Sequence, residues 1–314
     1  MVEDKKVSPQ GGPVGRSGMV SIVGRPNVGK STLLNKILGE KVSIVSKVPQ
    51  TTRNQIRGIF TDERGQIVFV DTPGVHKGRD QLDQFMNQSA YGITSEADVI
   101  IHLVDANDRV GMEEEELVRR FSDMKVPVIL GLNKVDMKGK NISEYIALYE
   151  RISGKPIQEN PRITLLPLSG KDGTNVPKLI DLVFELLPEG EKLYPEDTIC
   201  DIPQKMVIAD EIREKLYMLL NDELPHSIAV IIENLEQRKG KLLYIQAVIV
   251  VERDSQKSIV IGKNGSILKK AGSLARKDLE ELLDTKVFLE LFVKSNKDWR
   301  DSPSLLQDMG YQFM

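Results

Sequence analysis

The chain has 314 residues, enough for about two domains of ordinary size. Hydrophobic residues make up 40% and charged residues 28%, which excludes a disordered or fibrous protein. The 43 Lys and Arg residues nearly balance the 46 Asp and Glu residues, so any nucleic-acid binding has to use a local basic patch. A single cysteine, Cys200, excludes an intramolecular disulfide, and no apolar run approaches the ~20 residues that span a bilayer. We expect a soluble, cytoplasmic protein.

Residues 1–18 are rich in Gly, Pro and Ser and are expected to form a flexible arm. Residues 19–187 alternate between apolar runs and amphipathic helices, which predicts an α/β domain with a mostly parallel sheet and helices on both faces. The predicted strands are 19–24, 66–71, 98–106, 127–133 and 162–169. The predicted helices are 30–38, 113–124, 142–152 and 176–187.

Residues 188–203 contain three prolines and five acidic residues without periodicity, which indicates a linker. The order of elements then changes and predicts an α+β domain over 204–314 with antiparallel strands. Its predicted helices are 205–221 and 266–283, and its predicted strands are 228–235, 242–251 and 287–293.

The first chemical motif is a phosphate loop, GxxxxGK[ST], between a predicted strand and a predicted helix. Backbone N–H groups of such a loop surround phosphate oxygens, its lysine contacts the β and γ phosphates, and its hydroxyl binds Mg²⁺. A chance glycine-rich turn is the alternative, and the strand and helix on either side argue against it. The predicted nucleotide-binding residues here are Gly24, Arg25, Pro26, Asn27, Val28, Gly29, Lys30, Ser31 and Thr32.

A second motif, DTPG, closes the next predicted strand and is followed by Val75. An acidic residue at the carboxyl end of a parallel strand beside a phosphate loop is placed to bind Mg²⁺ through water. A helix N-cap is the alternative for Asp71, but Gly74 would also bring its N–H to a γ-phosphate. We include Asp71, Thr72, Pro73, Gly74 and Val75 in the predicted nucleotide site.

The motif NKVD follows the strand predicted at 127–133 and indicates guanine as the base. An ionised Asp136 accepts two hydrogen bonds, from the ring N–H and the exocyclic amine of guanine, which adenine does not offer. An ordinary polar turn is the alternative, and the order of the motifs argues against it. The predicted base pocket comprises Asn133, Lys134, Val135, Asp136, Ser169, Gly170 and Lys171.

A GxxG loop at residues 262–265 leads into a basic helix, the signature of a KH domain, which clamps about four nucleotides of single-stranded RNA. Residues 253–277 hold seven basic residues and one acidic residue, Asp254; a solvated helix face is the alternative. Local propensity favours a strand over 258–261, whereas a KH domain needs a short helix there. The predicted RNA-binding residues are Gly262, Lys263, Asn264, Gly265, Lys269 and Lys270.

Together these motifs resemble those of the Era family, GTPases of the translation-factor class with a C-terminal type II KH domain. The resemblance covers about residues 19–312, with Gly170 replacing the alanine usual in the last base motif. It implies GTP hydrolysis with Lys30, Thr52 and Gly74 as catalytic residues. It also implies Mg²⁺ at Ser31, Thr52 and Asp71, and K⁺ beside Asn27 and Thr51. Many small GTPases orient the attacking water with a glutamine at the position of Val75, so slow intrinsic hydrolysis is expected.

The resemblance further implies that the RNA is the 3′-end region of 16S ribosomal RNA and that the protein acts in assembly of the 30S subunit. Peripheral contact with the cell membrane is also implied. Two alternatives stay open: an RNA-binding module with a structural, non-hydrolysing nucleotide site, and a membrane-associated regulatory GTPase. A tRNA-modifying GTPase would need a modification domain and a reactive cysteine tail, which the sequence lacks.

Overall fold

A seven-stranded sheet forms the centre of the first domain in the computed structural model, which describes residues 15–46, 48, 51–74, 78, 80–137, 141–220, 224–309 and 311. The strands run in the order β6-β5-β4-β1-β3-β2-β7. Those from β6 to β3 are parallel, while β2 pairs antiparallel with β3 and with β7. The bounds are β1 Arg16–Val23, β2 Ile56–Asp62, β3 Gly65–Asp71, β4 Val99–Asp105, β5 Val128–Asn133, β6 Ile163–Pro167 and β7 Cys200–Asp201.

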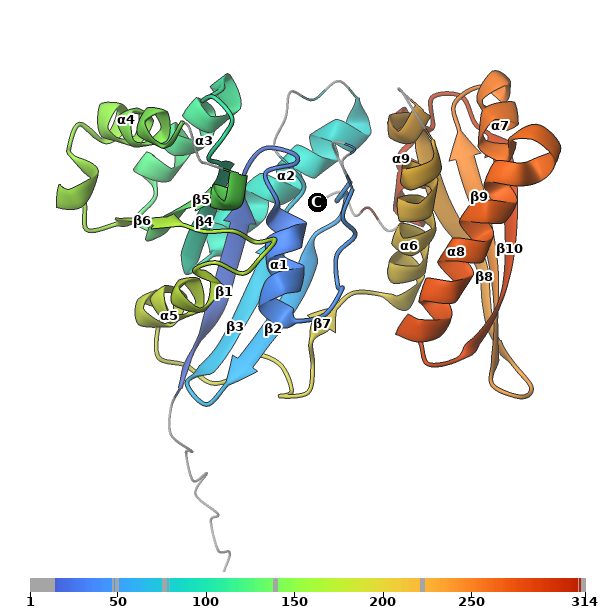
Figure 1. Cartoon of the computed structure of the whole chain (residues 1–314), viewed down its shortest axis with the longest axis horizontal. Helices are drawn as coiled ribbons and strands as arrows, with labels where there is room; N and C mark the ends of the chain where they lie inside the picture. Colours follow the sequence, from blue (N-terminus) through green and yellow to red (C-terminus); the bar gives the residue numbers. More distant parts are fainter. Residues whose placement is uncertain are drawn as a thin grey trace, which may run out of the picture.

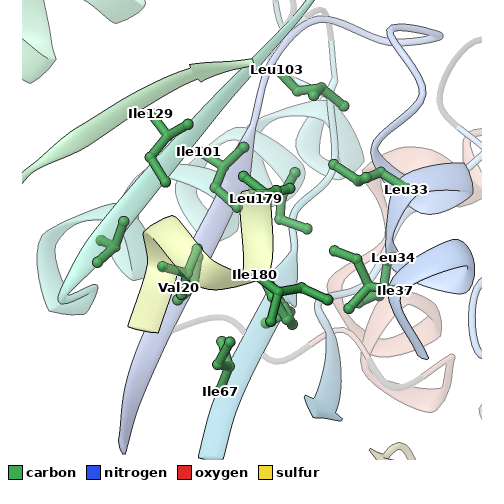
Figure 2. Close-up of a cluster of buried hydrophobic side chains, with 14 of the residues drawn as sticks. Val20, Leu33, Leu34, Ile37, Ile67, Ile101, Leu103, Ile129, Leu179 and Ile180 are labelled. Carbon is green, nitrogen blue, oxygen red and sulfur yellow. The ribbon is translucent and has the colours of Figure 1, made fainter. Parts of the chain in front are cut away.

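Helices cover both faces of this sheet, as the alternating sequence pattern predicts (Figure 1). Their bounds are α1 Lys30–Leu38, α2 Gln81–Glu96, α3 Met112–Asp123, α4 Ile142–Ser153 and α5 Val176–Leu186. Figure 2 shows one face, where Leu33, Leu34 and Ile37 of α1 and Leu179 and Ile180 of α5 meet strand residues. Helices α3 and α4 pack on the other face. Burying both faces explains the continuous apolar runs of the central strands.

The second domain has a three-stranded sheet in the order β10-β9-β8, with α6, α7 and α8 packed on one face. The bounds are α6 Gln204–Leu219, β8 Ile228–Arg238, β9 Leu242–Val251, α7 Asp254–Ile261, α8 Ser266–Leu282, β10 Lys286–Ser295 and α9 Pro303–Asp308. Figure 1 shows α6 on the side of this domain that faces the first domain. Within the described ranges, no helix has both the length and the apolar character needed to cross a membrane.

The two domains also meet through α2. Its Leu82, Phe85 and Met86 pack against the second sheet and against Trp299 and Tyr311 near the C-terminus. Trp299 is fully buried, and its Nε1–H donates to the Ser227 carbonyl over 3.2 Å. The helix that follows the DTPG strand therefore lies in the interface between the domains.

Several expectations about the first domain are wrong. Residues 1–14 of the expected arm lie outside the described residues. Its expected end at residue 18 is wrong, because β1 begins at Arg16, whose guanidinium donates to the carbonyls of Glu185 and Leu187 at 2.8 and 2.9 Å. Strand β2 and helix α2 were not predicted from the sequence. Strand β2 contains Gly58 and ends in polar residues, so it lacks the apolar run of the central strands. Residues 200–201 of the expected linker belong to the sheet as β7.

In the second domain, the expectation of uniformly antiparallel strands is wrong, because β10 pairs parallel with β9. The two helices between them return the chain to the same end of the sheet, as a parallel connection requires. The short helix expected at 258–261 is confirmed as the end of α7. Gln256 caps its start by accepting from the N–H groups of Glu252 and Arg253, and Val260 is fully buried. Capping and burial thus override the strand propensity.

Candidate functional site

The phosphate loop connects β1 to α1, with Gly29 at the helix N-cap and the helix N-terminus directed at the loop. The Lys30 side chain is buried, and its Nζ donates to the carbonyls of Gly24 and Arg25 at 3.0 Å each. An ammonium held inside the loop is positioned to exchange these carbonyl contacts for phosphate oxygens.

Three oxygen-bearing side chains predicted to bind Mg²⁺ lie together beside this loop. The Ser31 Oγ–H donates to Asp71 Oδ2 over 2.7 Å, and Ser31 Oγ lies 2.8 Å from Thr52 Oγ1. Ser43, which the sequence analysis did not single out, donates to the same Asp71 oxygen over 3.2 Å. Hydroxyl and carboxylate oxygens are the ligands that Mg²⁺ prefers.

Burial makes the charged forms of Lys30 and Asp71 unfavourable when no ligand is bound. Burial lowers the pKa of Lys30 to about 8, although Asp71 opposes the shift. Burial likewise raises the pKa of the Asp71 carboxyl, and Lys30 and the Ser31 hydroxyl oppose that shift. The second carboxylate oxygen, Asp71 Oδ1, is buried without a hydrogen-bond partner among the described residues. A divalent cation and its water ligands would satisfy this oxygen, so these residues fit Mg²⁺.

The base motifs hold the loops of the site to one another. Asn133 donates to the Val28 carbonyl over 2.7 Å and accepts from the Gly170 N–H over 2.9 Å. Ser169 donates to Asp136 Oδ1 over 2.9 Å, which keeps that carboxylate oriented. The NKVD loop therefore joins the phosphate loop to the loop after β6.

Lys134 is fixed by a residue that the sequence analysis missed. Its Nζ pairs with Asp105 Oδ2 at 2.7 Å and donates to the Asn27 carbonyl, also at 2.7 Å. Asp105 ends β4, the strand between β1 and β5. No phosphate or base motif follows that strand, so no local pattern pointed to Asp105.

Most of the remaining predicted residues line the same edge of the first sheet. Thr72 donates to the Ile22 carbonyl over 2.9 Å, and a Cβ added at Gly74 would meet the Pro26 nitrogen at 2.7 Å, so the DTPG loop lies against the phosphate loop. The Val135 N–H donates to the Leu168 carbonyl. Lys171 is exposed. Val75 lies outside the described residues.

Arg25 extends away from the other predicted phosphate-binding residues. Its side chain forms an ion pair with Glu114 of α3 and donates to the Arg109 carbonyl. Its backbone carbonyl still accepts from Lys30. The side chain of Arg25 therefore fixes the phosphate loop to α3.

A cavity of about 740 Å³ opens beside the phosphate loop, and the second domain supplies part of its wall. Tyr217 and Met218 of α6 line it together with residues of the phosphate loop and of segment 44–52. The predicted K⁺ residues Asn27 and Thr51 both line this cavity, and the Thr51 hydroxyl donates to the Val48 carbonyl over 2.5 Å. Tyr217 and Met218 belong to no sequence motif, so only the packing of the two domains identifies them as residues of the cavity wall.

The GKNG loop lies in the second domain between α7 and α8. Gly265, at the N-cap of α8, has φ +75°, a left-handed conformation that favours glycine. An added Cβ there would meet no atom closer than 3.8 Å, so the backbone is open to an approaching ligand. Lys263, Lys269 and Lys270 are all exposed. The loop and the first turns of α8 thus form an accessible basic surface.

Comparisons with known proteins agree with this geometry. Residues 19–134 match the family described as 50S ribosome-binding GTPase, and residues 223–300 match the KH domain family. The GTPase Era of Halothermothrix orenii is 46% identical over 298 residues, which cover 95% of this chain and 99% of that protein. The GTPase Era of Geobacter metallireducens is 46% identical over 94% of this chain and 98% of that protein.

Two crystal structures resemble the whole fold. One is a variant of Aquifex aeolicus Era bound to GDP and AlF4⁻, and the other is Era in complex with MgGDPNP and nucleotides 1506–1542 of 16S ribosomal RNA. Each is 38% identical with a TM-score of 0.87, and each match covers 95% of this chain and 100% of the other chain. The similarity therefore includes both domains.

The buried lysine predicts that affinity for GTP falls as pH rises. In the nucleotide-free site the pKa of Lys30 is about 8, and bound phosphates would keep this amine protonated. Binding should therefore take up a proton above pH 8, and the dissociation constant should rise roughly three-fold between pH 7.5 and 8.5. Calorimetry in two buffers of different ionisation enthalpy measures this uptake. Lys30→Met should abolish it, and a parent protein that takes up no proton would contradict the assignment.

Proposed function

The chain belongs to the Era family of GTPases, and from this premise we propose that it binds the 3′-end region of 16S ribosomal RNA through its KH domain and acts in assembly of the 30S subunit. The observation that carries the proposal is the accessible GKNG loop, with exposed lysines in the first turns of α8, on the same chain as a complete set of nucleotide motifs. A similar protein, Era, has been crystallised with MgGDPNP and this part of 16S RNA. Sequencing RNA crosslinked to the purified protein tests the target.

We assign the residues of the first domain as follows. Lys30 holds the β and γ phosphates, and the Gly74 N–H donates to the γ-phosphate. Ser31, Thr52 and Asp71 hold Mg²⁺, which supplies positive charge to the phosphate oxygens when it is bound. Hydrolysis then depends on electrostatic stabilisation of the charge that develops on the transferred phosphoryl group.

The base pocket and the RNA surface complete the assignment. Asp136, held by Ser169, accepts from the ring N–H and the amine of guanine. On the RNA surface, Gly262 and Gly265 let phosphates approach the backbone, and Lys263, Lys269 and Lys270 supply positive charge. We further propose a cytoplasmic location, where 30S subunits form. Peripheral membrane contact remains an expectation from the family resemblance.

We also propose that K⁺ assists hydrolysis beside Asn27 and Thr51. Both residues line the nucleotide cavity, and each supplies oxygen atoms of the kind that alkali cations bind. A positive charge there would add to that of Mg²⁺ and Lys30 near the transferred phosphoryl group.

The assignment of Asp136 predicts a change of base specificity. In Asp136→Asn an amide N–H₂ replaces one acceptor oxygen, which opposes the amine of guanine and suits the carbonyl of xanthine. We expect GTP affinity to fall by about 100-fold or more and xanthosine triphosphate to bind instead. Asp172→Asn is the matched control, because Asp172 accepts from Thr174 on the neighbouring loop. Unchanged GTP affinity of Asp136→Asn would show that the base lies elsewhere.

The K⁺ proposal predicts faster hydrolysis in KCl than in NaCl at equal ionic strength. Asn27→Ala should remove the difference between the salts while nucleotide binding largely survives. Single-turnover rates at saturating GTP measure both effects. Equal rates of the parent in the two salts would leave Asn27 with a role in loop structure alone.

The RNA proposal predicts that a substitution in the GKNG loop weakens RNA binding without weakening nucleotide binding. Gly265→Asp places a carboxylate where a phosphate approaches, so RNA affinity should fall by about ten-fold or more while GTP affinity stays the same. Gly265→Asn is the matched control, because it adds a side chain of the same shape without the charge and tolerates positive φ equally well.

Salt titrations separate phosphate contacts from other effects. Lys263→Ala or Lys270→Ala should lower the slope of log affinity against log salt by up to ~1. If Gly265→Asp binds RNA like the parent, the GKNG loop is a turn without an RNA contact.

A further inference from the structure

Helix α6 of the second domain holds both ends of the segment that carries Thr51 in the first domain. At one end, the Val45 N–H donates to Glu214 Oε1 over 3.1 Å. At the other end, Arg213 Nη2 donates to the Thr51 carbonyl over 2.9 Å. In Figure 1 the blue segment after α1 lies on the side of the first domain that faces α6. Two adjacent residues of one helix thus fix the segment at two points.

Both residues are themselves firmly held. Arg213 and Glu214 are only 4% and 6% exposed. Asp210 Oδ1 pairs with Arg213 Nη2 at 2.7 Å, one helical turn away. Glu214 Oε2 receives hydrogen bonds from Lys41 and Lys215 at 2.5 and 2.9 Å. Burial alone would raise the pKa of the Glu214 carboxyl, but the hydrogen bonds from these lysines hold this pKa below its usual range. Glu214 is therefore a carboxylate acceptor at neutral pH.

The contact from Arg213 acts directly on Thr52. The Thr51 carbonyl belongs to the peptide group that joins Thr51 to Thr52, and a planar peptide fixes the Cα of Thr52 relative to that oxygen. On the other side of Thr52, Arg53 is 1% exposed, and its Nη1 donates to the Ile228 carbonyl at the start of β8 over 2.8 Å. Thr52 therefore lies between two attachments to the second domain, with its hydroxyl 2.8 Å from Ser31 Oγ.

We propose that Arg213 and Glu214 are positioning residues for GTP hydrolysis, through which the second domain holds Thr52 in the geometry that the reaction needs. We call these two residues the α6 clamp. The inference rests on the role of Thr52 proposed above. A hydroxyl placed by backbone contacts has to be held within fractions of an ångström to stabilise a transition state, and loop residues alone seldom achieve this.

The test compares single-turnover hydrolysis at saturating GTP in the full-length protein. Arg213→Gln should slow hydrolysis about ten-fold or more, because a charged hydrogen bond to the Thr51 carbonyl is lost. GDP affinity should change less than two-fold, since GDP lacks the γ-phosphate near Thr52. Arg213→Lys, which keeps one donor, should recover part of the rate. Glu214→Ala, which removes the acceptor of the Val45 N–H, provides an independent variant.

Two controls separate positioning from general loosening of the interface. Arg300→Gln removes another arginine between the domains, which is partly buried and pairs with Asp80 and Asp83 at the start of α2. It should leave hydrolysis within about two-fold of the parent. In the Thr52→Ala background, Arg213→Gln should have no further effect, because both changes act through the same hydroxyl.

Other results would contradict either the α6 clamp or the role of Thr52. Parent-like hydrolysis by both Arg213→Gln and Glu214→Ala overturns the clamp. An Arg300→Gln variant that loses as much hydrolysis activity as Arg213→Gln also overturns the clamp. So does a double variant in which Arg213→Gln slows hydrolysis a further ten-fold beyond Thr52→Ala alone. If Thr52→Ala itself hydrolyses GTP like the parent, the assignment of Thr52 is wrong, and the clamp fails with it.

Discussion

Two opposite charges are buried at the carboxyl edge of the first sheet, and the arrangement of the nucleotide site depends on them. Lys30 donates to backbone carbonyls, and Asp71 accepts from the hydroxyls of Ser31 and Ser43. Burial lowers the pKa of Lys30 and raises that of Asp71, so each shift favours the neutral form of its group. Phosphate oxygens and a divalent cation are the partners that would stabilise the charged forms, so the protein prepares the electrostatics of the site before any ligand binds.

The sequence predicted the nucleotide site more completely than the fold around it. Phosphate-binding and base-binding motifs recur because their chemistry needs particular residue types at the ends of strands, so the positions of Ser31, Asp71 and Asp136 followed from spacing. Strand β2 was missed because it lies near the sheet edge with polar residues, and α2 because half of its apolar residues face the other domain. Asp105, Tyr217 and Arg213 act through tertiary packing, which leaves no local pattern.

The second domain is more than an RNA-binding appendage to the first. Its helix α6 contributes to the wall of the nucleotide cavity and contacts the segment that carries Thr52. On the opposite side, its sheet and the buried Trp299 pack against α2, which follows the DTPG loop. The segment with Thr52 and the DTPG loop, which we assign to Mg²⁺ and the γ-phosphate, therefore both lead into the interface.

Pairing of β7 with β2 has a consequence for how far the second domain can move. Because Cys200 and Asp201 are part of the first sheet, only Ile202 and Pro203 separate that sheet from α6. Two extended residues span at most about 7 Å, and proline restricts one of them further. If the interface opened, α6 would remain tethered close to its docking surface, at an effective concentration in the millimolar range or higher. The tether permits a pivot of the second domain about one end of α6 and makes redocking an intramolecular event.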